Sequence, residues 1–75
     1  MYIRTQDRNC LINFDRFHQI SLDEENYQIN AIFFNGENKV VVPLGGFKTL
    51  EKAKAEYEEI LDALLDEEVG TYEVE

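Results

Sequence analysis

The expected fold depends most on one segment, Ala31-Ile32-Phe33-Phe34-Asn35-Gly36-Glu37-Asn38-Lys39-Val40-Val41-Val42. Two runs rich in β-branched and aromatic residues flank Asn35-Gly36. Asn and Gly best tolerate the positive φ that both central residues of a type I′ turn require. The segment therefore predicts an antiparallel hairpin with a two-residue turn. Its register would place Phe34 opposite Glu37, Ile32 opposite Lys39, Ala31 opposite Val40 and Ile29 opposite Val42.

Side-chain alternation in this hairpin predicts one apolar face and one mixed face. The apolar face would carry Tyr27, Ile29, Ala31, Phe33, Val40, Val42 and Leu44. The mixed face would carry polar residues together with Ile32, Phe34 and Val41. Three large apolar side chains are too many for a fully solvated face. Either another segment covers them, namely residues 10–22 or the C-terminal residues, or they form a dimer or partner surface.

The N-terminal part of the chain predicts two further strands. Residues 2–5 have the pattern of a short strand, and Gln6-Asp7-Arg8-Asn9 has the composition of a turn. Residues 10–22 alternate as a longer strand, but the alternation breaks at Asp15-Arg16-Phe17. The break predicts a β-bulge near Asp15 or Arg16.

The C-terminal part predicts one amphipathic helix. Gly45-Gly46 would end the last strand, and Thr49 is a suitable N-cap. Apolar residues then recur at three- and four-residue spacings, at Leu50, Ala53, Tyr57, Ile60, Leu61 and Leu64. Beyond Leu65, Asp66-Glu67-Glu68 would place acids at the negative end of the helix dipole, so the helix is expected to end there.

These expectations combine into an α+β fold. We predict a four-stranded antiparallel sheet in meander order, with one C-terminal α-helix packed on one face. Residues 1–66 would form this single ββββα domain, and residues 67–75 a loose acidic tail. The expected core consists of Ile12, Phe14, Ile29, Ala31, Phe33, Val40, Val42, Leu50, Ala53, Tyr57, Ile60, Leu61 and Leu64.

Negative charge is concentrated in the last third of the chain. The 75 residues have a net charge of -9, and residues 49–75 contribute ten carboxylates and two lysines. An acidic chain is poorly suited to direct contact with nucleic acid backbones, so a direct nucleic acid partner is not expected. The acidic helix flank is ordinarily a solvated face. Alternatively, it imitates phosphate charge and occupies a basic groove through Glu51, Glu56, Glu58, Glu59 and Asp62.

The sequence shows no catalytic or metal-binding pattern. Cys10 and His18 are the only Cys and His, and in an extended strand they would lie about 26 Å apart. No CxxC, HExxH or EF-hand spacing occurs. We therefore expect neither an enzyme nor a cofactor or metal. A single cysteine, the lack of a signal peptide and the lack of a long apolar run favour a cytoplasmic protein without membrane contact.

Two segments carry a resemblance to known proteins. One is Met1-Tyr2-Ile3-Arg4-Thr5-Gln6-Asp7, followed by Leu11-Ile12-Asn13, and the other is Leu44-Gly45-Gly46-Phe47-Lys48-Thr49-Leu50-Glu51-Lys52-Ala53. In both, the chain resembles small, mostly uncharacterised proteins of low-GC Gram-positive bacteria and their prophages. The resemblance implies a hairpin–hairpin–helix layout and a phage or mobile-element origin, and it implies no active site. Gly46 and the acidic tail depart from the pattern of the group.

The functional expectation is a small non-catalytic protein–protein interaction module. It would bind a protein partner or form a homodimer through Ile32, Phe34 and Val41. The alternative is an acidic inhibitor, of the phage accessory type, that occupies the basic groove of a nucleic-acid-binding protein.

Overall fold

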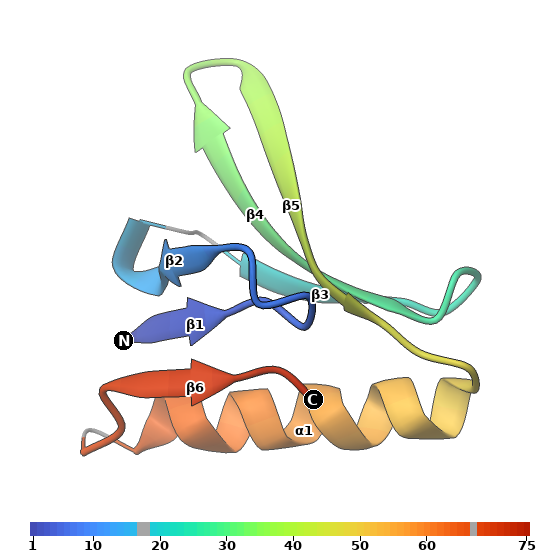
Figure 1. The fold of residues 1–75 in the computed structure, drawn as a ribbon. Coiled ribbons are helices and arrows are strands. Elements are labelled where there is room, and N and C mark those ends of the chain that lie inside the picture. Colours follow the sequence, from blue (N-terminus) through green and yellow to red (C-terminus); the bar gives the residue numbers. More distant parts are fainter. Residues whose placement is uncertain (17–18, 67) are drawn as a thin grey trace.

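The computed structural model describes residues 1–16, 19–66 and 68–75. Its elements are β1 (Tyr2–Arg4), β2 (Leu11–Asn13), the 3₁₀ helix η1 (Phe14–Arg16), β3 (Gln19–Asp23), β4 (Gln28–Asn35), β5 (Asn38–Gly46), α1 (Leu50–Leu65) and β6 (Thr71–Glu73) (Figure 1). The expected position of His18 in a strand lies outside the described residues.

The strands form two three-stranded sheets, in the orders β2-β1-β6 and β3-β4-β5. The predicted single four-stranded meander is therefore wrong. The two sheets separate at η1, where we expected only a β-bulge near Asp15 or Arg16. The Asn13 side chain accepts a hydrogen bond from the Asp15 amide at 3.1 Å, which stabilises a local turn in competition with an extended strand.

The C-terminal residues complete the first sheet. β6 pairs in parallel with β1, with Ile3 opposite Tyr72, and Val74 beyond it is fully buried. Residues 71–74 are thus not the loose tail that we expected. The segment is acidic, and its alternation of buried and exposed side chains is short. Tyr72 and Val74 face inwards, and Glu73 faces outwards.

The β4–β5 hairpin forms, but its register differs from the prediction. Asn35 pairs with Asn38 and Phe34 pairs with Lys39, so Gly36 and Glu37 occupy the turn. Of these two, only Gly36 has a positive φ, of 65°, as in a type II′ turn. The partners are shifted by two residues along β5. Because a shift of two preserves alternation, the predicted faces are kept around Phe34. Tyr27 instead lies outside the strand, in the β3–β4 turn.

A bulge in β5 brings the two sheets together. Asn30 pairs with Pro43 and Ile29 with Gly45, so Leu44 is the extra residue, and it is buried. A Cβ on Gly45 would lie 3.0 Å from Val74 Cγ1 and 3.1 Å from Gln6 Cβ, so any larger residue would force these side chains to shift. Gln6 then connects three segments, because its amide donates to Leu44 O, its Oε1 accepts from the Gly46 amide, and its Nε2 donates to Glu75 O.

The helix and core follow the predicted pattern in part. Thr49 caps α1, its side chain accepting a hydrogen bond from the Lys52 amide at 3.2 Å. Of the expected core, Ile12, Ile29, Ala31, Ala53 and Ile60 are buried, and Phe14, Val42, Tyr57 and Leu64 pack partly buried against them. Phe33, Val40, Leu50 and Leu61 are only half-buried. Ile3, Leu44 and Val74 complete the core cluster.

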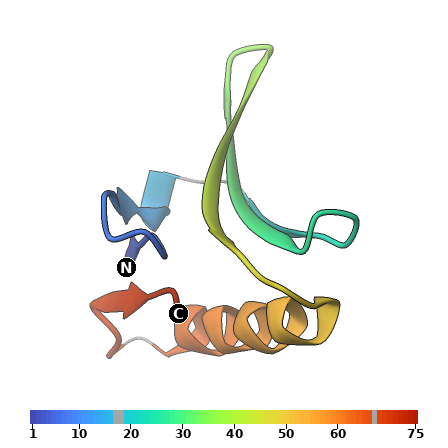
Figure 2. The same ribbon diagram turned by 45° about the vertical axis from the view of Figure 1, so that its right-hand side comes forward.

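The outer half of the β4–β5 hairpin projects from the rest of the molecule, as both views show (Figures 1 and 2). Within the described residues, β3 pairs with β4 only as far as Ile32. Among the described strands, residues 33–40 pair only with one another, and we call this two-stranded part of the hairpin the arm. No described helix is long and apolar enough to cross a membrane.

Candidate functional site

The three residues predicted as an interaction surface lie on one face of the β4–β5 hairpin. Ile32 pairs with Val41, and Phe34 is two residues further along β4. Phe34 is 47% exposed and Val41 46% exposed, whereas Ile32 is only 4% exposed. Phe34 and Val41 are thus accessible to a partner, while Ile32 is a buried residue at the base of the arm.

The arm carries apolar residues on its other face as well. Phe33 and Val40 form a cross-strand pair there, and both are half-buried. The sequence pattern predicts core positions for both residues, because they share a face with Ala31, although its register placed Val40 opposite Ala31. The pair is less covered than Ala31 because it lies beyond the last β3–β4 pair, a position that alternation alone does not reveal.

Only some of the residues of the predicted acidic flank are exposed to solvent. Glu51, Glu58, Glu59 and Asp62 are exposed on α1, as expected. Glu56 is 6% exposed, so its prediction as a solvent-facing charge is wrong. It lies between Ala53 and Ile60 on the buried side of the helix, beneath the C-terminal residues.

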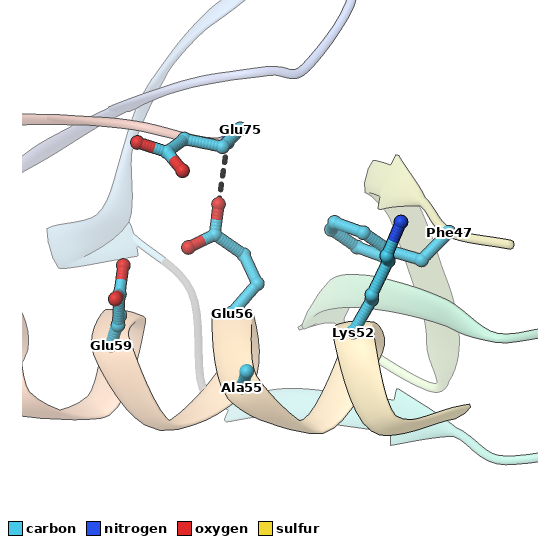
Figure 3. Close-up of a pocket in the computed structure, with 6 residues that line it drawn as sticks. All are labelled: Phe47, Lys52, Ala55, Glu56, Glu59 and Glu75. Carbon is cyan, nitrogen blue, oxygen red and sulfur yellow. Dashed lines mark hydrogen bonds between the residues drawn. The ribbon is translucent and has the colours of Figure 1, made fainter. Parts of the chain in front are cut away.

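Glu56 fastens the helix to the end of the chain. One carboxylate oxygen accepts a hydrogen bond from the Tyr72 hydroxyl at 2.5 Å. The other oxygen accepts from the Glu75 amide, also at 2.5 Å (Figure 3). The Tyr72 hydroxyl also lies 3.3 Å from Glu59 Oε2. A buried carboxylate is costly unless it is hydrogen-bonded, and here both oxygens have a donor.

Tyr72 acts in this cluster as a hydrogen-bond donor. Burial raises the pKa of its phenol, and the hydrogen bond to Glu56 and the nearby carboxylates of Glu56 and Glu59 raise it further. A phenol with a raised pKa stays protonated and is a poor nucleophile. The arrangement therefore serves to hold β6 against α1.

An open cleft of about 260 Å³ adjoins this cluster, and its lining residues are Phe47, Lys52, Ala55, Glu56, Glu59 and Glu75 (Figure 3). Lys52 and Phe47 both line this cleft, and the Glu56 carboxylate points towards the Glu75 backbone. In the part of the chain that the structure describes, no group of three His, Cys, Asp or Glu residues is arranged to hold a metal ion.

Cys10 is exposed and follows a tight turn. Its amide donates to Thr5 Oγ1 at 3.2 Å, and its carbonyl accepts from the Thr5 amide at 3.0 Å. These bonds use the Cys10 backbone to close the β1–β2 connection. Its predicted separation from His18 involves a residue outside the described ranges, so it stays a prediction.

Comparisons of the chain with protein-family models, with curated proteins and with solved structures found no match. The resemblance to small proteins of Gram-positive bacteria and prophages stays a prediction.

Proposed function

We propose that the protein is a small non-catalytic interaction module that binds a protein partner through its arm and the adjoining Val41. The observation that supports this is the exposure of Phe34 and Val41 on a two-stranded extension of the fold. An isolated two-stranded hairpin is only marginally stable in water. A partner that covers these side chains would stabilise the arm and remove apolar surface from water.

The setting that we propose is the cytoplasm. The support is the single cysteine of the chain, which is exposed and unpaired and therefore suits a reducing compartment. The resemblance described above supports an origin in a prophage or another mobile element of a Gram-positive bacterium.

The substitution Phe34→Lys tests the arm as the binding surface. It places a charge at the centre of the exposed apolar area, and we expect it to abolish association measured by sedimentation velocity and by capture of the partner protein. Leu11→Lys is the matched control, because Leu11 is 56% exposed on the other sheet and the charge change is the same. Binding that survives Phe34→Lys, with the thermal unfolding midpoint unchanged, would contradict the proposal.

A second candidate function is supported by the helix. The exposed carboxylates of Glu51, Glu58 and Asp62 recur at seven- and four-residue intervals, so they follow one side of α1. No ion pair of the described residues involves them. We propose as the alternative that this row occupies the basic groove of a nucleic-acid-binding protein by imitating phosphates.

Charge reversal tests the alternative. The triple substitution Glu51→Lys, Glu58→Lys and Asp62→Lys should abolish capture of a basic, nucleic-acid-binding protein from nuclease-treated lysate. Reversing Glu24 and Glu25 to Lys is the control, since both are exposed and belong to the β3–β4 turn, not to the helix. Equal loss in the triple variant and the control would show a net-charge effect and would eliminate the helix as the binding site.

A further inference from the structure

β5 has an open edge along the arm. In the second sheet β5 pairs with β4 alone among the described strands. The turn at Gly36 and Glu37 makes Asn35 and Asn38 the closing pair of the hairpin, and such a pair is hydrogen-bonded. Hydrogen-bonded and non-hydrogen-bonded pairs alternate in an antiparallel ladder. The backbone groups of Lys39, Val41 and Pro43 therefore point away from β4.

Pro43 limits how far the open edge of β5 extends towards Gly46. Pro43 lacks an amide hydrogen at the position where that hydrogen would point away from β4, which is a position that edge strands permit. Further along, Leu44 O accepts from the Gln6 amide and the Gly46 amide donates to Gln6 Oε1. Gln6 thus covers the inner part of β5, and the outward-pointing amides of Lys39 and Val41 lie on the remaining part.

Charge favours a second copy of the chain at this edge. Residues 28–46 contain one acid, Glu37, and one base, Lys39, which cancel, so the rest of the chain carries the whole net charge of -9. Two copies repel each other wherever their acidic bodies approach. The hairpin is the neutral part, and an identical strand edge is self-complementary about a two-fold axis.

We propose that residues 38–42 of β5 pair in antiparallel fashion with the same residues of a second copy, joining two three-stranded sheets into one of six strands. This pairing rests on the proposed function of the arm and names its partner. It supplies main-chain hydrogen bonds from Lys39 and Val41.

The substitution Val41→Pro tests the edge, because it removes an amide hydrogen that points away from β4. We expect dimerisation, measured by sedimentation equilibrium from about 1 μM to about 1 mM, to weaken about tenfold or more. Val41→Thr is the matched variant, since it keeps the amide and the β-branched shape, and it should dimerise more tightly than Val41→Pro. A Val41→Pro variant that dimerises like the wild type would overturn the pairing.

Amide hydrogen exchange gives a second measurement on the unmodified chain. The Lys39 and Val41 amides should exchange slowly only at protein concentrations where the dimer forms. The Val40 amide, which belongs to a hydrogen-bonded pair within the hairpin, should be protected at every concentration. A dimer in which the Lys39 and Val41 amides still exchange rapidly would overturn edge pairing.

Pairing with a second copy and binding of another protein through the arm are tested separately. A wild-type chain that remains monomeric across the concentration range overturns pairing with a second copy. The Phe34→Lys substitution still decides, with a captured partner protein, whether the arm is a binding surface.

Discussion

The Glu56 carboxylate holds the end of the chain on α1 through the Tyr72 hydroxyl and the Glu75 amide. We predict that Tyr72→Phe destabilises the protein by about 1–3 kcal/mol at neutral pH, because one oxygen of a buried carboxylate loses its donor. Urea unfolding measures this change. Tyr2→Phe is the control, as Tyr2 lies on β1 of the same sheet with a side chain that is 46% exposed. Equal free energies of unfolding for Tyr72→Phe and the wild type would contradict the assigned role of Glu56.

The same phenol makes this difference depend on pH. The pKa of Tyr72 is raised by burial and by the neighbouring carboxylates, above the value of about 10 of an unfolded tyrosine. The stabilisation is therefore complete below about pH 10 and falls as the pH rises further, because the unfolded chain releases this proton first. The free-energy difference between the wild type and Tyr72→Phe should be constant up to about pH 10 and shrink between about pH 10 and about pH 11. A constant difference would show that the phenol is not coupled to folding.

At the scale of elements, α1 is stabilised by the side chains that it buries against both sheets. Ile60 is fully buried on α1, whereas Leu65, at its last turn, is 84% exposed. We predict that Ile60→Ala lowers the free energy of unfolding by about 2–5 kcal/mol, and that Leu65→Ala changes it by about 0.5 kcal/mol or less. Thermal and urea unfolding of the two variants test this contrast, and equal effects would mean that the helix does not dock through Ile60.

The elements that sequence reasoning identified are those with local signals. Thr49 and the apolar spacing predict α1, and Gly36 predicts a hairpin, because the cap and the turn depend on adjacent residues. β6 could not be predicted in this way, since its partner β1 lies at the other end of the sequence. The burial of Glu56 depends on β6, and Ile32 pairs with Gln19, the first residue of β3. Phe34 and Val41 are exposed, as a binding surface requires, whereas Glu56 and Ile32 are buried. That Phe34 and Val41 bind a partner stays a prediction.

At the scale of the whole molecule, the net charge makes the two candidate functions respond differently to salt concentration. The net charge of -9 lies outside residues 28–46, so these charged parts of two copies repel each other. The screening length falls from about 10 Å at 0.1 M salt to about 3 Å at 1 M. We predict that self-association measured by sedimentation velocity becomes stronger over this range, while binding of the acidic flank to a basic groove becomes weaker. Self-association that weakens with salt would show that ion pairs, and not the neutral edge, join the copies.

The pairing of β1 with β6 has a consequence for the order of folding. Gln6 and Glu75, which bond to each other, are 69 residues apart in the chain, so closing the first sheet requires a large loss of chain entropy. The β4–β5 hairpin has only short loops to close. Contacts between distant residues slow folding, so we expect the hairpin to form early and the first sheet late. During synthesis, Ile3 and Ile12 would then remain uncovered until β6 emerges from the ribosome. This is the interval in which a chaperone could recognise the nascent chain.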